Sequence, residues 1–432
     1  MRILAVTETC DLASLYMRLV ADGHAVRVHV SDDSARGTGA GLFERIVDWR
    51  AALPWIRKAG KDGIIVFEAV SDGLGPLQDQ LRRDGYHVIG GSTEGDRLEN
   101  DRAYAQGIMA KCGLAIAPVH EFDDATAANV FIEQNPARYV LKFSGPGYAS
   151  SDNYLGQLAD GSDVRAVLVA RASSTARGLF ILMPYLDGIE VGVGAYFDGD
   201  RFLQPACLDW EHKRFFAGDL GELTGEMGTV ATFERAEALF ELTLAKLAPH
   251  FRGRGHAGWI NLNTIVNSSG IWPLELTCRF GYPGFAVLEP LQATRWGELF
   301  KSLVTRDGAD LATRPGYSVG VVLTTPPFPY TRKQVAEPIG LPVVFDAAVD
   351  DADRMHFHYG EVGLHDGQLV TSGLYGWTMV VTGSGTNVGE AQAAAYARIG
   401  RVVIPNMRYR LDIGSKLVSG DLERMHGLLA KN

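Results

Sequence analysis

Apolar positions follow two different periods in the first part of the chain, and the two periods alternate. "RILAVT" and "HAVRVHV" are short apolar runs typical of buried strands, and "LASLYMRLVADG" between them has the spacing of an amphipathic helix that ends at glycine. The runs "GIIVFEAV" and "YHVIGG" predict further strands. Up to about residue 95 the pattern therefore predicts a small doubly wound α/β domain.

The pattern changes after this point and then changes once more. A helix over "DRLENDRAYAQGIMAKCG" is followed by strands that alternate with Gly-rich turns, "RYVLKFSG", "GLFILMPYLDG" and "EVGVGAYFDGDRF". Pro and Gly in "ATRPGYSVGVVLTTPP" mark a second boundary, after which "YSVGVVLTT", "MHFHYGEV" and "LVTSGLYGWTMVVTG" each predict a strand. A helix over "NVGEAQAAAYARIG" follows, with Asn387 placed to cap it. We predict a multidomain protein of mixed α/β and α+β class, with domains at 1–97, 98–315 and 316–432.

Composition narrows the class of protein. At 432 residues and 46.9 kDa the chain is too long for one ordinary core. Its net charge of -10 argues against a protein that depends on general attraction to nucleic acids. The four cysteines are scattered without zinc-ligand spacing, the chain enters a strand at once, and no apolar run is long enough to cross a membrane. We expect a cytoplasmic protein with small-molecule substrates and neither a nucleic-acid nor a membrane partner.

Two charged residues stand inside apolar strands, Lys142 in "RYVLKFSG" and Glu275 in "WPLELTCRF". A charge in an apolar strand is costly unless it meets a partner. Phosphate is a suitable partner for Lys142, and Gly145, Pro146 and Gly147 would let backbone N–H groups approach it. The alternative is a lysine on an edge strand whose ammonium reaches solvent.

Glu275 would then have a partner of its own. A carboxylate that faces nucleotide phosphates can hold the magnesium ion that bridges them, and Asn261 in "GWINLNTIV" could add a second oxygen. The alternative is a structural ion pair between Glu275 and Arg279.

The stretch "LMPYLDGIEVGV" has the pattern of an adenine slot with a ribose clamp. A flat base can lie against Tyr185 and Leu186, and Glu190 can accept hydrogen bonds from both ribose hydroxyls. A solvated glutamate after a β-turn is the alternative.

The order of these pieces resembles the ATP-grasp ligases, and one family among them resembles far more of the chain. "EHKRFFAGDLGELTGEMGT" is similar to the D-H-K-R...G-D-x-G-x-x-T-G-G-M-G run of the phosphoribosylamine-glycine ligase family, and "LELTCRFGYP" to its E-F-N-x-R-F-G-D-P. "GSTEGDRLENDRAYAQGIM", "VVTGSGTNVGEAQAAAY" and "MRYRLDIG" resemble other segments of that family. The resemblance implies an ATP-grasp fold between an N-terminal doubly wound domain and a small, β-rich C-terminal domain.

The resemblance also implies a reaction and roles for single residues. ATP would phosphorylate a carboxylate, and an amine would attack the acyl phosphate, with Mg²⁺ as cofactor. Lys213 and Arg279 would be catalytic, and Glu275 with Asn261 would bind the metal. The remaining matched positions would contact ATP (Arg102, Lys142, Tyr185, Leu186 and Glu190) or the acid and its acyl phosphate (Thr224, Gly225, Met227 and Gly228).

The chain departs from the family where phosphoribosylamine would bind. The family's G-x-G-G-R-E-H turn is replaced by "VTETCDLAS", so Thr7, Glu8, Cys10 and Asp11 stand where glycines, Arg and His are expected. Trp377 aligns with a second expected Arg. These changes remove positive charge, so we expect an amine that is less anionic, or one with an aromatic group that stacks on Trp377, with Arg408 or Arg410 as rival phosphate contacts.

The residues expected around the carboxylic acid substrate and the metal also differ from the family, since Thr277, Tyr282 and Gly284 replace an Asn and two carboxylates. The "SGPGYASSDNY" loop lacks the family's second Lys. The first hypothesis is therefore an ATP-dependent carboxylate-amine ligase with altered substrates. The alternatives are the purine-pathway ligase itself and a nucleotide-binding regulator without catalysis.

Overall fold

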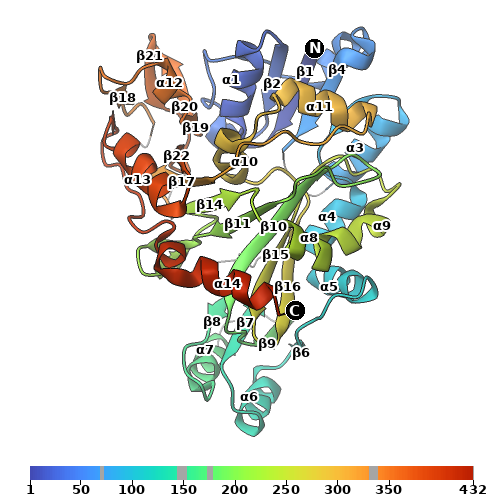
Figure 1. The fold of residues 1–432 in the computed structure, drawn as a ribbon, viewed down its shortest axis with the longest axis vertical. Coiled ribbons are helices and arrows are strands. Elements are labelled where there is room, and N and C mark those ends of the chain that lie inside the picture. The colour runs from blue at the N-terminus through green and yellow to red at the C-terminus, as the bar shows by residue number, and fades with distance from the viewer. Residues whose placement is uncertain (69–72, 144–152, 173–178, 330–338, 432) are drawn as a thin grey trace.

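The computed structural model describes residues 1–68, 73–143, 153–172, 179–329 and 339–431 (Figure 1). The predicted mixed α/β architecture is confirmed. None of the described helices is both long and apolar enough to span a membrane. The Gly-rich segment at 145–147, predicted to approach phosphate, lies outside the described residues.

The N-terminal part is a five-stranded parallel sheet with the order β3-β2-β1-β4-β5. Alternate residues of its central strands enter two cores: Ile3 and Ala5 face α1, while Leu4 and Val6 face α2. This two-sided burial explains the continuous apolar runs in the sequence. The elements are β1 (Arg2–Thr7), α1 (Ala13–Ala21), β2 (Ala25–Val30), β3 (Glu44–Arg45), α2 (Leu53–Arg57), β4 (Gly63–Phe67), α3 (Leu74–Arg83) and β5 (His87–Ile89).

A small antiparallel sheet with the order β6-β9-β7-β8 follows two connecting helices. Two helices cover one face and form a separate core with it, at the bottom of Figure 1. The other face contacts Leu186 and Trp272. The elements are α4 (Thr93–Asn100), α5 (Arg102–Lys111), β6 (His120–Phe122), α6 (Ala125–Gln134), β7 (Tyr139–Phe143), β8 (Tyr154–Leu155), α7 (Ser162–Ala172) and β9 (Phe180–Pro184).

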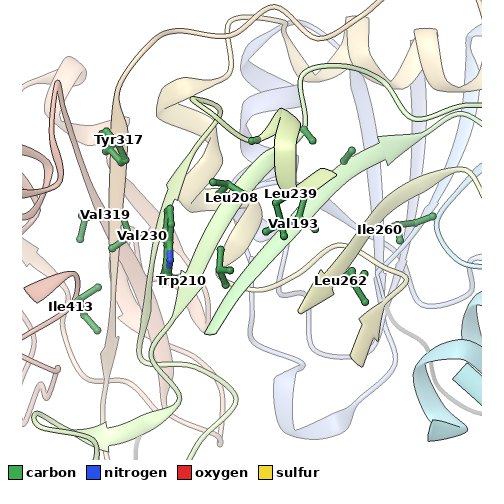
Figure 2. Close-up of a cluster of buried hydrophobic side chains, with 14 of the residues drawn as sticks. Val193, Leu208, Trp210, Val230, Leu239, Ile260, Leu262, Tyr317, Val319 and Ile413 are labelled. Carbon is green, nitrogen blue, oxygen red and sulfur yellow. The ribbon is translucent and has the colours of Figure 1, made fainter. Parts of the chain in front are cut away.

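An eight-stranded sheet with the order β16-β15-β10-β11-β14-β17-β22-β19 occupies the centre of the molecule. Its antiparallel strands are buried on both faces, and Figure 2 shows one of the two cores, with Val193, Leu208, Trp210 and Val230 among its members. The strands are β10 (Ile189–Phe197), β11 (Cys207–Glu211), β14 (Gly228–Thr232), β15 (Gly258–Asn267), β16 (Gly270–Thr277), β17 (Tyr317–Thr324), β19 (Phe357–Tyr359) and β22 (Trp377–Gly385).

Helices and short strands cover this sheet. One face packs under α8 (Glu237–Leu242), α13 (Val388–Ile399) and α14 (Leu422–Leu429), and the other under α10 (Gly284–Leu288), α11 (Trp296–Thr305) and α1. Asn387 caps α13 as predicted, since its Oδ1 accepts the N–H of Glu390 at 2.9 Å. The remaining elements are β12 (Arg214–Phe216), β13 (Leu220–Leu223), α9 (Ala248–Phe251), β18 (Val344–Phe345), α12 (Asp351–Arg354), β20 (Val362–His365), β21 (Gln368–Thr371), β23 (Val402–Val403) and the short 3-10 or π segments 33–35, 50–52, 60–62, 244–247, 289–291 and 417–421.

Two sequence-based strands are divided in the structure. "MHFHYGEV" forms β19 and β20 with a break at Gly360 and Glu361, and "LVTSGLYGWTMVVTG" forms β21 and β22 with a break at 372–376. The Glu361 carboxylate explains the second break, because it accepts N–H groups of that segment that would otherwise enter a ladder. The eight-stranded sheet contains strands from both sides of residue 315, and the division into three domains remains a prediction.

Candidate functional site

A cluster of charged side chains gathers at one edge of the eight-stranded sheet. Glu190 begins β10, Glu275 lies in β16, and Lys213 follows β11. The Lys213 Nζ lies 3.1 Å from Glu190, 3.0 Å from Glu211 and 3.3 Å from Glu275. We call Glu190, Glu211, Lys213 and Glu275 the charged cluster. Burial works against the ammonium charge, but the three carboxylates hold the pKa of Lys213 well above its ordinary value.

Glu275 has cationic partners, which explains its place in an apolar strand. Lys213 is the largest cause that lowers its pKa to about 2, burial opposes this, and Lys142 and Arg102 add to the lowering. The Nη2 of Arg102 lies 3.0 Å from the Glu275 carboxylate. Arg279, the alternative partner, instead forms an ion pair with Glu99 at 3.0 Å. Glu275 therefore belongs to the charged cluster and is not part of an ion pair with Arg279.

Lys142 lies in β7 opposite Ile181 of β9, where the small sheet approaches the charged cluster. Burial, and after it the charge of Arg102, lower the pKa of Lys142 to about 8, while Glu275 opposes the shift. An anion beside Lys142 would favour its charged form, as expected of a phosphate contact.

The two residues of the expected adenine slot have different surroundings. Leu186 packs in an apolar group with Met183 and Trp272. The ring of Tyr185 is covered by the Arg138 guanidinium, which lies 3.5 Å from the ring centroid. One face of the tyrosine is therefore already occupied, and Leu186 with its neighbours provides the free apolar surface.

The segment 224–228 is held against the charged cluster by backbone contacts. The N–H and the hydroxyl of Thr224 both donate to the Lys213 carbonyl at 2.8 Å, and the Met227 N–H donates to the His212 carbonyl at 2.8 Å. A Cβ on Gly225 would lie 2.8 Å from the Trp377 ring, so only glycine allows this approach. Gly228, at the start of β14, pairs with Val321 of β17.

Asn261 and Asn263 share one face of β15, and the strand register separates their surroundings. Asn263 lies opposite Glu275 and its amide donates to Glu190 at 2.7 Å, whereas Asn261 lies opposite Thr277 and donates to Asp209 at 2.5 Å. Sequence reasoning named Asn261 only. The sequence could have indicated Asn263, because it lies two residues after Asn261 and alternate residues of a strand share one face.

Sequence reasoning missed Glu211 of the cluster and two further acids near it, Asp209 and Glu226, although all three lie in the segments "CLDWE" and "TGEMG". Burial is the first cause that raises the pKa of Asp209 to about 7, and Glu211 adds to it. Burial also raises the pKa of Glu226 well above its ordinary value. In the part of the chain that the structure describes, no group of three or more His, Cys, Asp or Glu side chains is arranged to hold a metal ion by itself.

A cavity lies on the other side of the segment 224–228, where the Trp377 ring contacts Gly225. It is a cavity of about 220 Å³, which we call the aromatic pocket, and its lining residues are Thr9, Cys10, Asp11, Tyr282, Phe328, Pro329, Gly360, Glu361, Tyr375 and Trp377. The structure thus brings Asp11, Tyr282 and Trp377, three departures seen in the sequence, to a single place.

Comparisons with known proteins agree with this geometry. Residues 100–285 match the model of the phosphoribosylglycinamide synthetase ATP-grasp (A) domain. The chain is 27% identical to phosphoribosylamine-glycine ligase of Neisseria meningitidis serogroup B over 358 residues, which cover 79% of this chain and 82% of that protein. The ligase of the same name from Mycobacterium bovis is 26% identical and covers 98% of this chain and 100% of its own length.

Solved structures give the same assignment of fold. Phosphoribosylamine-glycine ligase of Thermotoga maritima superposes with a TM-score of 0.70 at 21% identity and covers 96% of this chain and 100% of its own. Biotin carboxylase of Campylobacter jejuni gives 0.63 at 12% identity and covers 94% and 92%. These comparisons support a relationship between the chain and the phosphoribosylamine-glycine ligase family of the ATP-grasp superfamily. Members of this family are ADP-forming carbon-nitrogen ligases, and the chain takes its place in that enzyme class.

In this ATP-grasp chain, backbone N–H groups at the N-terminus of α1 donate hydrogen bonds to a carboxyl group of the protein itself. Glu68 accepts the backbone N–H groups of Asp11 and Leu12 at 3.0 and 3.2 Å and the hydroxyl of Tyr16 at 2.5 Å. Burial, and after it Asp11, raise the pKa of Glu68 to about 8. The family resemblance leads one to expect an anion of a substrate at this helix end, and here the Glu68 carboxyl group accepts the N–H groups instead.

Proposed function

We propose that the chain is an ATP-dependent, magnesium-requiring ligase that joins a carboxylic acid to an amine, and that its substrates differ from phosphoribosylamine and glycine. The observation that carries the proposal is the charged cluster beside Lys142. Lys142, Arg102 and Lys213 supply positive charge where phosphates would lie, and Glu190 stands at the start of β10, within reach of a ribose bound beside Leu186.

The donor set suits magnesium. Mg²⁺ prefers oxygen ligands, and it is bound through one or two carboxylates together with substrate phosphates. Glu275 is the carboxylate best placed for this, and Asn263 is its cross-strand neighbour. We assign these two residues to the metal in place of Glu275 with Asn261. The ion would neutralise charge on the transferring phosphoryl group.

The reaction proposed for this site has two transfers. The γ-phosphoryl group of ATP passes to a carboxylate oxygen and ADP leaves. The amine nitrogen then attacks the acyl carbon, the bond between that carbon and the phosphate oxygen breaks, and the nitrogen gives up a proton as the amide forms. Lys213 and Lys142 would hold the phosphoryl oxygens, and the segment 224–228 would keep water from the acyl phosphate.

ADP release tests the proposal directly. Each of a panel of carboxylic acids is mixed with ATP and Mg²⁺, with and without each of a panel of amines, and we expect ADP from one acid-amine pair. Glu275→Gln should abolish that signal in a folded protein, because the change keeps the size and removes the charge. Glu121→Gln is the matched control, since Glu121 is an exposed strand residue on β6. No ADP with any pair, together with no binding of ATP, would refute the proposal.

The match over the whole length of the Mycobacterium bovis relative favours one other candidate, the reaction that the relative's name states. Growth of a purine-requiring strain that lacks the family enzyme would decide between the two. We expect no growth without added purine. Growth would establish phosphoribosylamine and glycine as the substrates.

A further inference from the structure

The aromatic pocket has a chemical character opposite to that of a phosphate site. Its walls include four aromatic side chains, Tyr282, Phe328, Tyr375 and Trp377. Two of its described lining residues, Asp11 and Glu361, are acidic, and none is basic. A pocket of this composition repels phosphate and attracts an organic cation, because aromatic faces and carboxylates both stabilise positive charge.

The aromatic rings are arranged as a continuous surface around Trp377. The Trp377 and Tyr282 ring centroids lie 4.9 Å apart with their planes at 31°, and Phe328 lies 5.7 Å from Trp377 at 33°. The backbone at Tyr375 and Trp377 is fixed by Glu361, whose carboxylate accepts both their N–H groups at 3.1 Å. The rings are therefore held in place before any ligand arrives.

Neither carboxylate of the pocket forms an ion pair with a Lys or Arg side chain of the described residues. Burial is the first cause that raises the pKa of Glu361 to about 7, its three backbone hydrogen bonds oppose the shift, and Asp11 adds to it. Burial is likewise the first cause that raises the pKa of Asp11, and Arg279 opposes it. Two buried polar groups of the wall, the Tyr282 hydroxyl and the Trp377 indole N–H, have no hydrogen-bond partner among the described residues.

Within the described part of the chain, the nearby groups that could bind an anion have other partners. Glu68 already binds the first free N–H groups of α1. Arg410, a rival phosphate contact in the sequence, is fully buried in ion pairs with Asp219 and Asp412. Arg408 donates to the Phe328 carbonyl and lies over the Phe215 ring.

The pocket adjoins the place where the acyl phosphate would form. Gly225 lies against the Trp377 ring, and Met227 packs with Phe328 and Trp377. Thr224, on the same segment, is bonded to the backbone of Lys213 in the charged cluster. A molecule in the pocket can therefore extend its reactive group past this segment toward the first site.

We propose that the aromatic pocket binds the amine substrate of the ligase, and that this amine is an organic ammonium with a flat apolar body and no phosphate. That the bound amine is a substrate rests on the proposed function. Its binding to the pocket needs no ATP. The size agrees: the cavity of about 220 Å³ exceeds the roughly 150 Å³ that holds benzene in an engineered cavity.

Binding of 2-phenylethylamine to the full chain, measured by calorimetry without ATP, tests the proposal. We expect saturable binding at pH 7.5, at least tenfold weaker binding of the uncharged 2-phenylethanol, and no binding of ribose 5-phosphate. Trp377→Ala and Asp11→Asn should each weaken binding of the amine roughly tenfold or more, the first through the lost ring face and the second through the lost charge. Trp377→Phe keeps an aromatic face and should lose less.

Asp366→Asn is the matched control, because Asp366 is 93% exposed on the turn between β20 and β21 and its loss also removes one negative charge. It should bind the amine as the wild type does. Equal binding of the amine and the alcohol, tighter binding of ribose 5-phosphate, or absence of binding by 2-phenylethylamine, tyramine and tryptamine alike would each overturn the proposal. ATP binding measured on the same samples separates the two ideas, since amine binding with no ATP binding would remove the proposed function and leave the pocket.

Discussion

Replacement of Lys213 by Met tests the charged cluster most sharply, because one ammonium faces three carboxylates. Each pair lies within 3.3 Å, but the side chains of Glu190 and Glu275 are 45% and 47% exposed. Solvent screening reduces such a pair to about 0.2 to 1 kcal/mol, so three pairs contribute about 1 to 3 kcal/mol. We expect Lys213→Met to lower the melting temperature by roughly 2 to 6 °C and to abolish ADP formation.

Magnesium gives this experiment a second readout. Without the ammonium, Glu190, Glu211 and Glu275 repel one another, and a divalent cation can take its place. Mg²⁺ in the absence of ATP should therefore raise the melting temperature of Lys213→Met more than that of the wild type. Lys246→Met is the control, because Lys246 is exposed and the structure shows no ion pair for it within the described ranges. An unchanged melting temperature, or an equal effect of Mg²⁺ on both proteins, would refute the account of the cluster.

The acid limb of the stability curve follows from the same contacts. The pKa of Glu275 is about 2, below its ordinary value of 4.5, with Lys213 as the largest cause. A depressed pKa contributes stability that is complete above about 4.5 and is lost as the pH falls toward 2. The difference in melting temperature between the wild type and Lys213→Met should therefore shrink as the pH falls from 5 to 3.

Three further predictions concern single contacts. Glu190→Ala should mainly raise the KM for ATP, because ribose contacts form in ground and transition states alike, and a large loss of kcat at saturating ATP would contradict that role. Asn263→Ala should raise the same KM and the Mg²⁺ concentration that the reaction requires, since it removes both the 2.7 Å hydrogen bond that orients Glu190 and the amide assigned to the metal, and an unchanged KM would contradict it. Glu68 has a pKa raised to about 8, so the wild type should lose more stability than Glu68→Gln as the pH rises from about 5 to 8, as thermal unfolding across that range would show.

Patterns within short segments predicted the structural features that depend only on residues close together in the sequence. The strand-helix-strand start, the cap at Asn387 and the charged residues in apolar strands needed only periodicity and the cost of a buried charge. Lys142 and Glu275 could be assigned to one site because each charge in an apolar strand required a partner of opposite charge. A phosphate would be the partner of Lys142, and a metal ion bound to that phosphate would be the partner of Glu275.

The rest depended on pairing between distant segments. Asn261 and Asn263 are equivalent in sequence, and only the register of β15 with β16, which shifts after Asn263, places one of them opposite Glu275. Contact between Glu68 and the N-terminus of α1 joins residues more than fifty positions apart, so no local pattern reports it. The break at Glu361 was hidden by the apolar residues on both sides of it.

The charged cluster and the aromatic pocket differ in how far they have departed from the family pattern, and the eight-stranded sheet explains how this is possible. The charged cluster lies on or next to β10, β11 and β16, in one half of the sheet, whereas Trp377 begins β22, which is separated from β11 by β14 and β17. Substitutions on β22 and on the turn before α1 therefore leave the pairing of β10, β15 and β16 unchanged, and distant changes of this kind act independently on stability. The segment 224–228 contacts both the charged cluster and the aromatic pocket, and it remains close to the family motif except at Glu226. An amine pocket can thus acquire aromatic walls and carboxylates while the site assigned to ATP keeps its charges.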